Sequence, residues 1–135
     1  MTDIILKKHQ FQCPIERVWK AITEASEISS WFIQADFMAE VGYHYTFTHE
    51  NTVITGDVLV VNPVTKLVYT WMVKGTNVIT TVSWKLESNS EGTMLTLEHS
   101  GISNYPGETA VAMFQNFNGG WDACLSGLEK YLTEE

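Results

Sequence analysis

The chain has 135 residues, with 8 Lys and Arg against 16 Asp and Glu, so its formal net charge is −8. This length fits a single domain, expected over residues 1–135, and the acidic balance argues against binding to a nucleic-acid backbone, which needs clustered basic side chains. No apolar run approaches the roughly 18 residues of a transmembrane helix, and the first residues lack the basic and apolar regions of a secretion signal. We therefore expect a cytoplasmic protein without a membrane span.

The first third of the chain predicts a strand followed by two short helices. Residues 4–11 are expected to form the strand, which ends at Cys13-Pro14 because a residue before proline is held extended. From Pro14 the apolar spacing becomes helical, and a second short helix is expected around residues 24–30. The apolar positions of the first helix are Ile15, Val18, Trp19 and Ile22.

A long region with apolar residues at every second position follows and predicts a meander of antiparallel strands. Its connections carry Asn, Pro, Gly and Ser, which are turn residues, and short connections make neighbouring strands antiparallel. Alternation along the strands indicates a sheet with one covered face and one face in water. The expected strands are residues 43–48, 52–61, 67–73, 78–86 and 93–99.

The last segment, residues 108–133, returns to helical spacing and predicts one long amphipathic helix. Gly119 and Gly120 lie inside it, at a cost in helix propensity that suggests a kink or a close approach of the helix to the sheet. Strands and helices segregated in this way predict an α+β fold with the helix across the covered face. The apolar stripe of the helix is Phe114, Phe117, Trp121, Cys124, Leu125, Leu128 and Leu132.

Several short motifs, in order along nearly the whole chain, resemble the helix-grip superfamily of START domains, polyketide cyclases and the birch-pollen allergen. They are most similar to the branch of activators of the heat-shock-protein-ninety ATPase. The matching segments are residues 14–23, Trp31-Phe32, residues 56–63 with 67–71, residues 92–101, and Gly120-Trp121 with Leu125, Leu128 and Leu132.

This resemblance implies a curved antiparallel sheet of six or seven strands that grips the C-terminal helix, with two short helices after the first strand. It also implies a cavity between sheet and helix for a small hydrophobic molecule. The branch includes a co-chaperone domain that stimulates a large ATPase, so a chaperone is a further expected partner.

Strand parity and helix phase predict which side chains would line such a cavity, and a solid core built from the same residues is the alternative. Trp71, Trp84 and Trp121 are expected to converge as three of its walls, whereas Trp19 and Trp31 are expected to close the end of the sheet. The predicted ligand-binding residues are Tyr45, Phe47, Val58, Tyr69, Trp71, Val82, Trp84, Leu97, His99, Phe117 and Trp121, and the same parity adds Val60, Leu95 and Cys124.

Catalytic groups are sparse in the sequence. His99 shares parity with the inward residues and is the one candidate general base, with a hydrogen-bonded structural histidine as the alternative. His44 is expected to face water, and His9 lies in the first strand with no acidic partner in view. No serine-nucleophile motif, phosphate loop or metal-ligand spacing is present, so we predict neither a metal nor a cofactor.

Cys13 and Cys124 are expected to be buried thiols in a reducing compartment, with a disulfide between them as the alternative. Residues 101–107 would form either a gate at the cavity mouth or a plain connector. The edge strand could pair with a copy of itself, so both a monomer and a homodimer remain open.

Three functions are compatible with these observations. The first is a non-enzymatic module that binds a small lipophilic molecule. The second is a chaperone-associated interaction module, for which Ile102 and Tyr105 would supply exposed apolar side chains. The third is an enzyme of cyclase or hydrolase type that uses His99.

Overall fold

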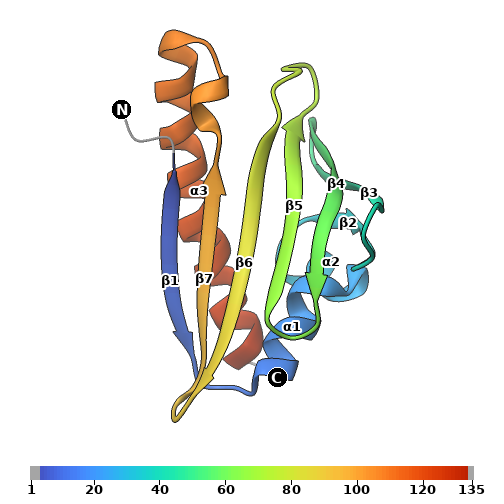
Figure 1. The fold of residues 1–135 in the computed structure, drawn as a ribbon, viewed down its shortest axis with the longest axis vertical. Helices are drawn as coiled ribbons and strands as arrows, with labels where there is room; N and C mark the ends of the chain where they lie inside the picture. Colours follow the sequence, from blue (N-terminus) through green and yellow to red (C-terminus); the bar gives the residue numbers. More distant parts are fainter. Residues whose placement is uncertain (1–3, 134–135) are drawn as a thin grey trace.

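The structure is a computed structural model that describes residues 4–133; residues 1–3, part of the start expected to lack a secretion signal, lie outside the described residues. One antiparallel sheet has the strand order β1-β7-β6-β5-β4-β3-β2. Helix α3 runs along one face of it, and α1 and α2 lie near one end of β4 and β5 (Figure 1), so the predicted helix-grip arrangement is confirmed. The strands are Ile5–Phe11 (β1), Gln34–Asp36 (β2), His44–His49 (β3), Thr52–Asn62 (β4), Lys66–Val73 (β5), Thr80–Asn89 (β6) and Gly92–Ser100 (β7), and the helices are Ile15–Thr23 (α1), Ala25–Trp31 (α2) and Gly107–Thr133 (α3).

The strand boundaries follow the predicted ones closely, with one addition. β2 was not expected, because two of its three residues, Gln34 and Asp36, are polar and exposed and give no apolar alternation. It forms by pairing with β3, where Ala35 lies opposite Phe47. This short strand brings the sheet to seven strands, within the expected six or seven.

A β-bulge in β4 changes which side chains reach the core. Val58 lies opposite Tyr69, but Val60 lies opposite Val68, so Leu59 is an extra residue on its strand. The alternation shifts by one residue at such a bulge. Leu59 is exposed, and Val61 rather than Val60 packs against the core, so the inward placement expected for Val60 is wrong.

Helix α3 buries the predicted apolar stripe from Trp121 to Leu132 against the sheet, whereas Phe114 and Phe117 of the same stripe are half-buried. The helix is continuous through Gly119 and Gly120, and a Cβ added at either glycine would meet nothing within 4 Å. The close approach of helix to sheet that these glycines suggested is therefore wrong.

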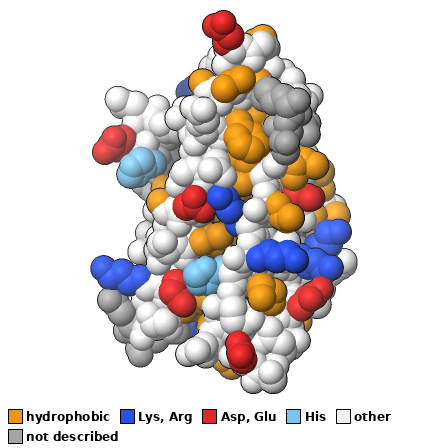
Figure 2. All heavy atoms as spheres, turned by 90° about the vertical axis from the view of Figure 1, so that its left-hand side faces the viewer, with side chains coloured by type: hydrophobic (Ala, Val, Ile, Leu, Met, Phe, Trp, Pro, Cys, Tyr) orange, Lys and Arg blue, Asp and Glu red, His pale blue; other side chains and the backbone are white. Residues whose placement is uncertain are grey.

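One ion pair and one contact between a histidine and a carboxylate join the edge strand β1 to α3. Lys7 Nζ lies 2.9 Å from an Asp122 carboxylate oxygen, and His9 Nε2 lies 3.5 Å from Glu129. Figure 2 looks onto the β1 side of the molecule and shows charged side chains interspersed with apolar ones. The expectation that His9 lacks an acidic partner is therefore wrong, because the folded chain brings Glu129 of α3 next to it.

The three helices are also joined to one another, at the end of β4 and β5 near which α1 and α2 lie. The Trp31 indole donates to the Ala21 carbonyl at 2.8 Å and so ties α2 to α1. Glu27 accepts from Arg17 at 2.7 Å and from the Tyr131 hydroxyl at 2.9 Å, which adds α3 to the contact. Trp31 thus has a structural role at this end, as the sequence predicted.

Two further expectations concern the thiols and the membrane. Cys124 is buried and Cys13 is half-buried, and the described chain contains no disulfide between them. Burial raises the pKa of the Cys124 thiol, so it stays protonated at neutral pH.

None of the helices within residues 4–133 is long and apolar enough to cross a membrane.

Candidate functional site

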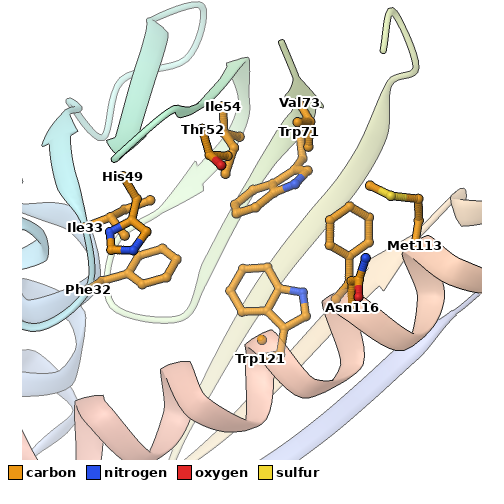
Figure 3. Close-up of a pocket in the computed structure, with 12 residues that line it drawn as sticks. Phe32, Ile33, His49, Thr52, Ile54, Trp71, Val73, Met113, Asn116 and Trp121 are labelled. Atoms are coloured by element: carbon orange, nitrogen blue, oxygen red, sulfur yellow. The ribbon is translucent and has the colours of Figure 1, made fainter. Parts of the chain in front are cut away.

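A cavity of about 390 Å³ lies between the sheet and α3. The α2–β2 junction contributes Phe32 and Ile33, and the middle of α3 contributes a series of residues that face the sheet. Figure 3 shows Trp71 on the sheet and Trp121 on α3 on either side of the space. The remaining lining residues are His49, Thr52, Ile54 and Val73 from the sheet and Met113, Asn116, Phe117 and Gly120 from α3.

The inner walls of this cavity are aromatic. The rings of Trp71 and Trp121 have centroids 5.2 Å apart, and Phe117 stands edge-on to Trp71 at 6.4 Å. Phe32 lies 6.2 Å from Trp121 and closes the side next to α2. Aromatic rings provide rigid apolar area at low entropic cost, which suits a binding site for an apolar molecule.

His99 lies directly behind these walls and is held at both ring nitrogens. The Trp121 indole N–H can only donate, so Nδ1 of His99 accepts from it at 2.9 Å and the ring carries its proton on Nε2. Nε2 then donates to Thr80 Oγ1 at 2.7 Å, and the Thr80 hydroxyl donates to the Trp71 carbonyl at 3.1 Å. Burial lowers the pKa of His99 to about 4, which keeps the ring neutral. This chain of bonds occupies the lone pair that a general base would use.

The sequence pattern of the family described as Activator of Hsp90 ATPase homolog 1-like protein matches residues 12–133. The chain belongs to this family. This family member resembles the Mesorhizobium loti protein MLL2253 with a TM-score of 0.89 and 25% identity over 97% of each chain. It also resembles Bacillus halodurans BH1534, with a TM-score of 0.79 and 27% identity over 96% of each chain. No functionally curated protein matches the chain significantly.

The chain also resembles the crystal structure of CalU16 from Micromonospora echinospora. The TM-score is 0.72 and the identity 26%, over 96% of this chain and 72% of CalU16. The likeness to these three proteins extends over the sheet and α3 together, because each match covers nearly the whole chain.

Three of the predicted ligand-binding residues line the cavity: Trp71, Phe117 and Trp121. Trp84 does not; it packs against the other side of Trp121 at 5.8 Å and donates to the Tyr69 hydroxyl at 2.9 Å. The remaining predicted residues, Tyr45, Phe47, Val58, Tyr69, Val82, Leu97 and His99, are buried in the core beside the cavity.

The deeper part of the space between sheet and helix is filled by aromatic side chains. Tyr45 packs on Phe47 and Tyr69 with centroids 4.6 and 5.0 Å apart, and Phe37 covers all three. The Tyr45 hydroxyl donates to the Thr70 carbonyl. Burial raises the pKa of both Tyr45 and Tyr69, so these hydroxyls remain protonated. The solid-core alternative thus describes this part of the interior, and the cavity lies beside it.

Several lining residues escaped the sequence analysis, although some carried a signal. Ile54 and Val73 continue the inward parity of their strands, and Met113 lies one helical turn before Phe117. His49 and Thr52 flank a hairpin turn, and only the folded sheet places them against α3.

The lining is uncharged apart from the titratable ring of His49: within residues 4–133 no Lys, Arg, Asp or Glu contributes to the cavity. The described residues also contain no group of three His, Cys, Asp or Glu that could hold a metal ion. His44 faces water, as expected, and lies 3.0 Å from Asp57 on the outer surface. The site can therefore surround an apolar molecule and offers few polar contacts.

The loop before α3 does not reach the cavity. Ile102 and Tyr105 are buried, with 0% and 3% of their surface exposed, so the prediction that they are exposed is wrong. They anchor the short 3-10 turn Ile102–Asn104, and Asn104 donates to the Ile79 carbonyl at 3.0 Å. The structure favours the connector alternative over a gate, since no residue of 101–107 lines the space.

Proposed function

We propose that this protein binds a small lipophilic molecule in the cavity between the sheet and α3. The observation that carries the proposal is the cavity itself: about 390 Å³ of space with aromatic walls and, within residues 4–133, no Lys, Arg, Asp or Glu in its lining. Natural small-molecule sites have this size, and most are apolar with a few placed polar groups. Membership of the family is consistent with a cavity that holds a ligand.

Two neighbouring glycines provide a matched test. Gly120 lines the cavity and Gly119 does not, yet both lie in α3 with open space around a new Cβ. A Leu at position 120 would fill part of the cavity, whereas a Leu at position 119 would change only helix propensity and surface. The neutral fluorescent probe N-phenyl-1-naphthylamine reports binding by increased emission.

We expect saturable probe binding to the wild type and to Gly119→Leu, and a Kd at least tenfold higher for Gly120→Leu. Circular dichroism checks that both variants keep the helix. If the wild type shows no saturable binding, or if Gly120→Leu binds like Gly119→Leu, the cavity is not a ligand site.

The family description supports a second candidate, an interaction that stimulates a large chaperone ATPase. Addition of the purified chain to such an ATPase should then raise its turnover and should retain the two proteins together in gel filtration. Gly120→Leu separates the candidates, because it changes a residue of the cavity and should weaken ligand binding, while an interaction through another surface should keep its effect on turnover. Unchanged turnover and separate elution would reject the chaperone role.

A further inference from the structure

Trp71 has a polar atom whose partner the protein does not supply. Its indole Nε1 is buried and makes no hydrogen bond. The neighbouring tryptophans Trp84 and Trp121 are buried to a similar degree, but the indole N–H of each has a hydrogen-bond acceptor. Trp84 donates to the Tyr69 hydroxyl and Trp121 to His99, both at 2.9 Å. A buried donor without a partner costs free energy, so native proteins rarely keep one without a reason.

The unpaired donor belongs to a wall of the cavity. Trp71 is 4% exposed and lines the space opposite Trp121. In Figure 3 the nitrogen-bearing edge of the Trp71 indole lies on the side of Met113. Met113 is half-buried, unbranched and itself a lining residue, so its side chain can adjust to a bound molecule on this side of the cavity.

The surroundings restrict the charge of such a molecule. Within residues 4–133 no lining residue is Lys or Arg, and the one lining imidazole, His49, is exposed to solvent. A carboxylate in the cavity would therefore lose its hydration without gaining a permanent cation. The net charge of −8 also opposes the approach of an anion. An ammonium group would in turn meet the positive end of the Trp71 N–H dipole. A neutral group that accepts a hydrogen bond fits both conditions.

We propose that the ligand is a neutral, largely apolar molecule with a carbonyl oxygen, and that Trp71 Nε1 donates a hydrogen bond to this oxygen. The inference rests on the proposed function, because it names the chemical class that the same cavity selects. Trp71 is then the residue that distinguishes a ketone or ester from a hydrocarbon of equal size.

Three probes with one skeleton test this selection: 2-acetylnaphthalene, its hydrocarbon analogue 2-isopropenylnaphthalene, and 2-naphthoate. Their dissociation constants are measured for the wild type and for Trp71→Phe, which keeps an aromatic wall and removes the donor. Comparing the ratio of ketone to hydrocarbon between the two proteins cancels the different solubility of the probes. We expect Trp71→Phe to weaken ketone binding about tenfold more than hydrocarbon binding.

A measurement on the wild type keeps the test valid even if Trp71→Phe does not fold. The assigned indole N–H resonance of Trp71 in a ¹H–¹⁵N spectrum should move downfield with 2-acetylnaphthalene and not with 2-isopropenylnaphthalene. The other indole resonances serve as internal controls.

The outcomes separate the two proposals. If neither neutral probe binds, the ligand-binding function fails, and the inference fails with it. A second outcome is that both neutral probes bind, that Trp71→Phe weakens their binding equally, and that both probes shift the Trp71 indole resonance by the same amount. In that case the ligand-binding function stands and the inference is overturned. If 2-naphthoate binds the wild type as tightly as the ketone, the restriction to neutral molecules is overturned.

Discussion

The indole N–H of Trp121 donates to Nδ1 of His99 at 2.9 Å, and this bond links a cavity wall to a buried histidine. The bond requires a neutral ring, because a protonated His99 has no lone pair at Nδ1. The structure of the cavity wall is therefore coupled to the protonation state of one residue.

The first prediction concerns acid. Burial lowers the pKa of His99 to about 4 in the folded protein, whereas the pKa of a histidine in the unfolded chain lies near its ordinary value of 6.5. Between these two pKa values the unfolded state binds more protons than the folded state. The contribution of His99 to the free energy of unfolding is therefore complete above pH 6.5 and is lost as the pH drops toward 4. The full loss from this residue is about 3 kcal/mol. Urea denaturation between pH 7.5 and 4.5 measures it.

His99→Gln is the control for this titration, because Gln does not ionise and its contribution is independent of pH. Subtracting its unfolding free energy from that of the wild type removes the effect of all other groups. Equal pH dependence in the two proteins would show that His99 does not titrate as its burial requires.

The second prediction concerns the hydroxyl that continues the hydrogen-bond chain. Thr80→Val keeps the shape and the β-branching of the side chain but leaves His99 Nε2–H and the Trp71 carbonyl without this partner. We expect a loss of about 1–3 kcal/mol in the free energy of unfolding. Thr81→Val on the other face of β6 is the matched control and should change stability by about 0.5 kcal/mol or less. Equal effects of the two substitutions would contradict the importance of the chain.

The third prediction concerns the stability gained when a glycine of α3 is replaced by alanine. Gly120→Ala should raise the free energy of unfolding by about 1 kcal/mol, because alanine is the better helix former and its Cβ would meet nothing within 4 Å. Gly127→Ala should give a smaller gain, since a Cβ there lies 3.4 Å from the Trp31 carbonyl oxygen. Thermal denaturation of both variants checks the order, and a destabilised Gly120→Ala would show that the space is not open.

The fourth prediction concerns Glu27, where three helices meet. Burial raises the pKa of this carboxyl, but the hydrogen bonds from Arg17 and Tyr131 outweigh it and hold the pKa below its usual value. Glu27→Gln should lower the free energy of unfolding by about 1–2 kcal/mol at pH 7, because the charged hydrogen bonds become neutral. The difference from the wild type should shrink as acid protonates Glu27. The exposed Glu24→Gln is the control and should have little effect.

Much of the fold followed from local patterns, because alternation and helical spacing report which side of an element is buried. The stripe from Trp121 to Leu132 and the inward parity of Trp71 and Trp84 were visible in this way. The bulge at Leu59 was not, since an inserted residue leaves no mark in composition and only the pairing with β5 defines it.

The position of the cavity could be predicted only in part. Parity places a side chain on a face but cannot tell whether a neighbour fills the space in front of it. Phe37 fills the space before Tyr45 and Tyr69, whereas the space before Trp71 stays open as far as Gly120. That difference depends on where α2, β2 and α3 meet, which is a property of the assembled chain.

The edge strand β1 has a consequence for how the chain folds. Its backbone partner is β7, where Ile5 lies opposite His99, and its side-chain partners Asp122 and Glu129 lie on α3. During synthesis β1 therefore has no native strand partner until roughly two thirds of the 135 residues have followed it. Contacts of such long sequence separation slow folding, and we expect the docking of β1 to be a late step that completes the sheet.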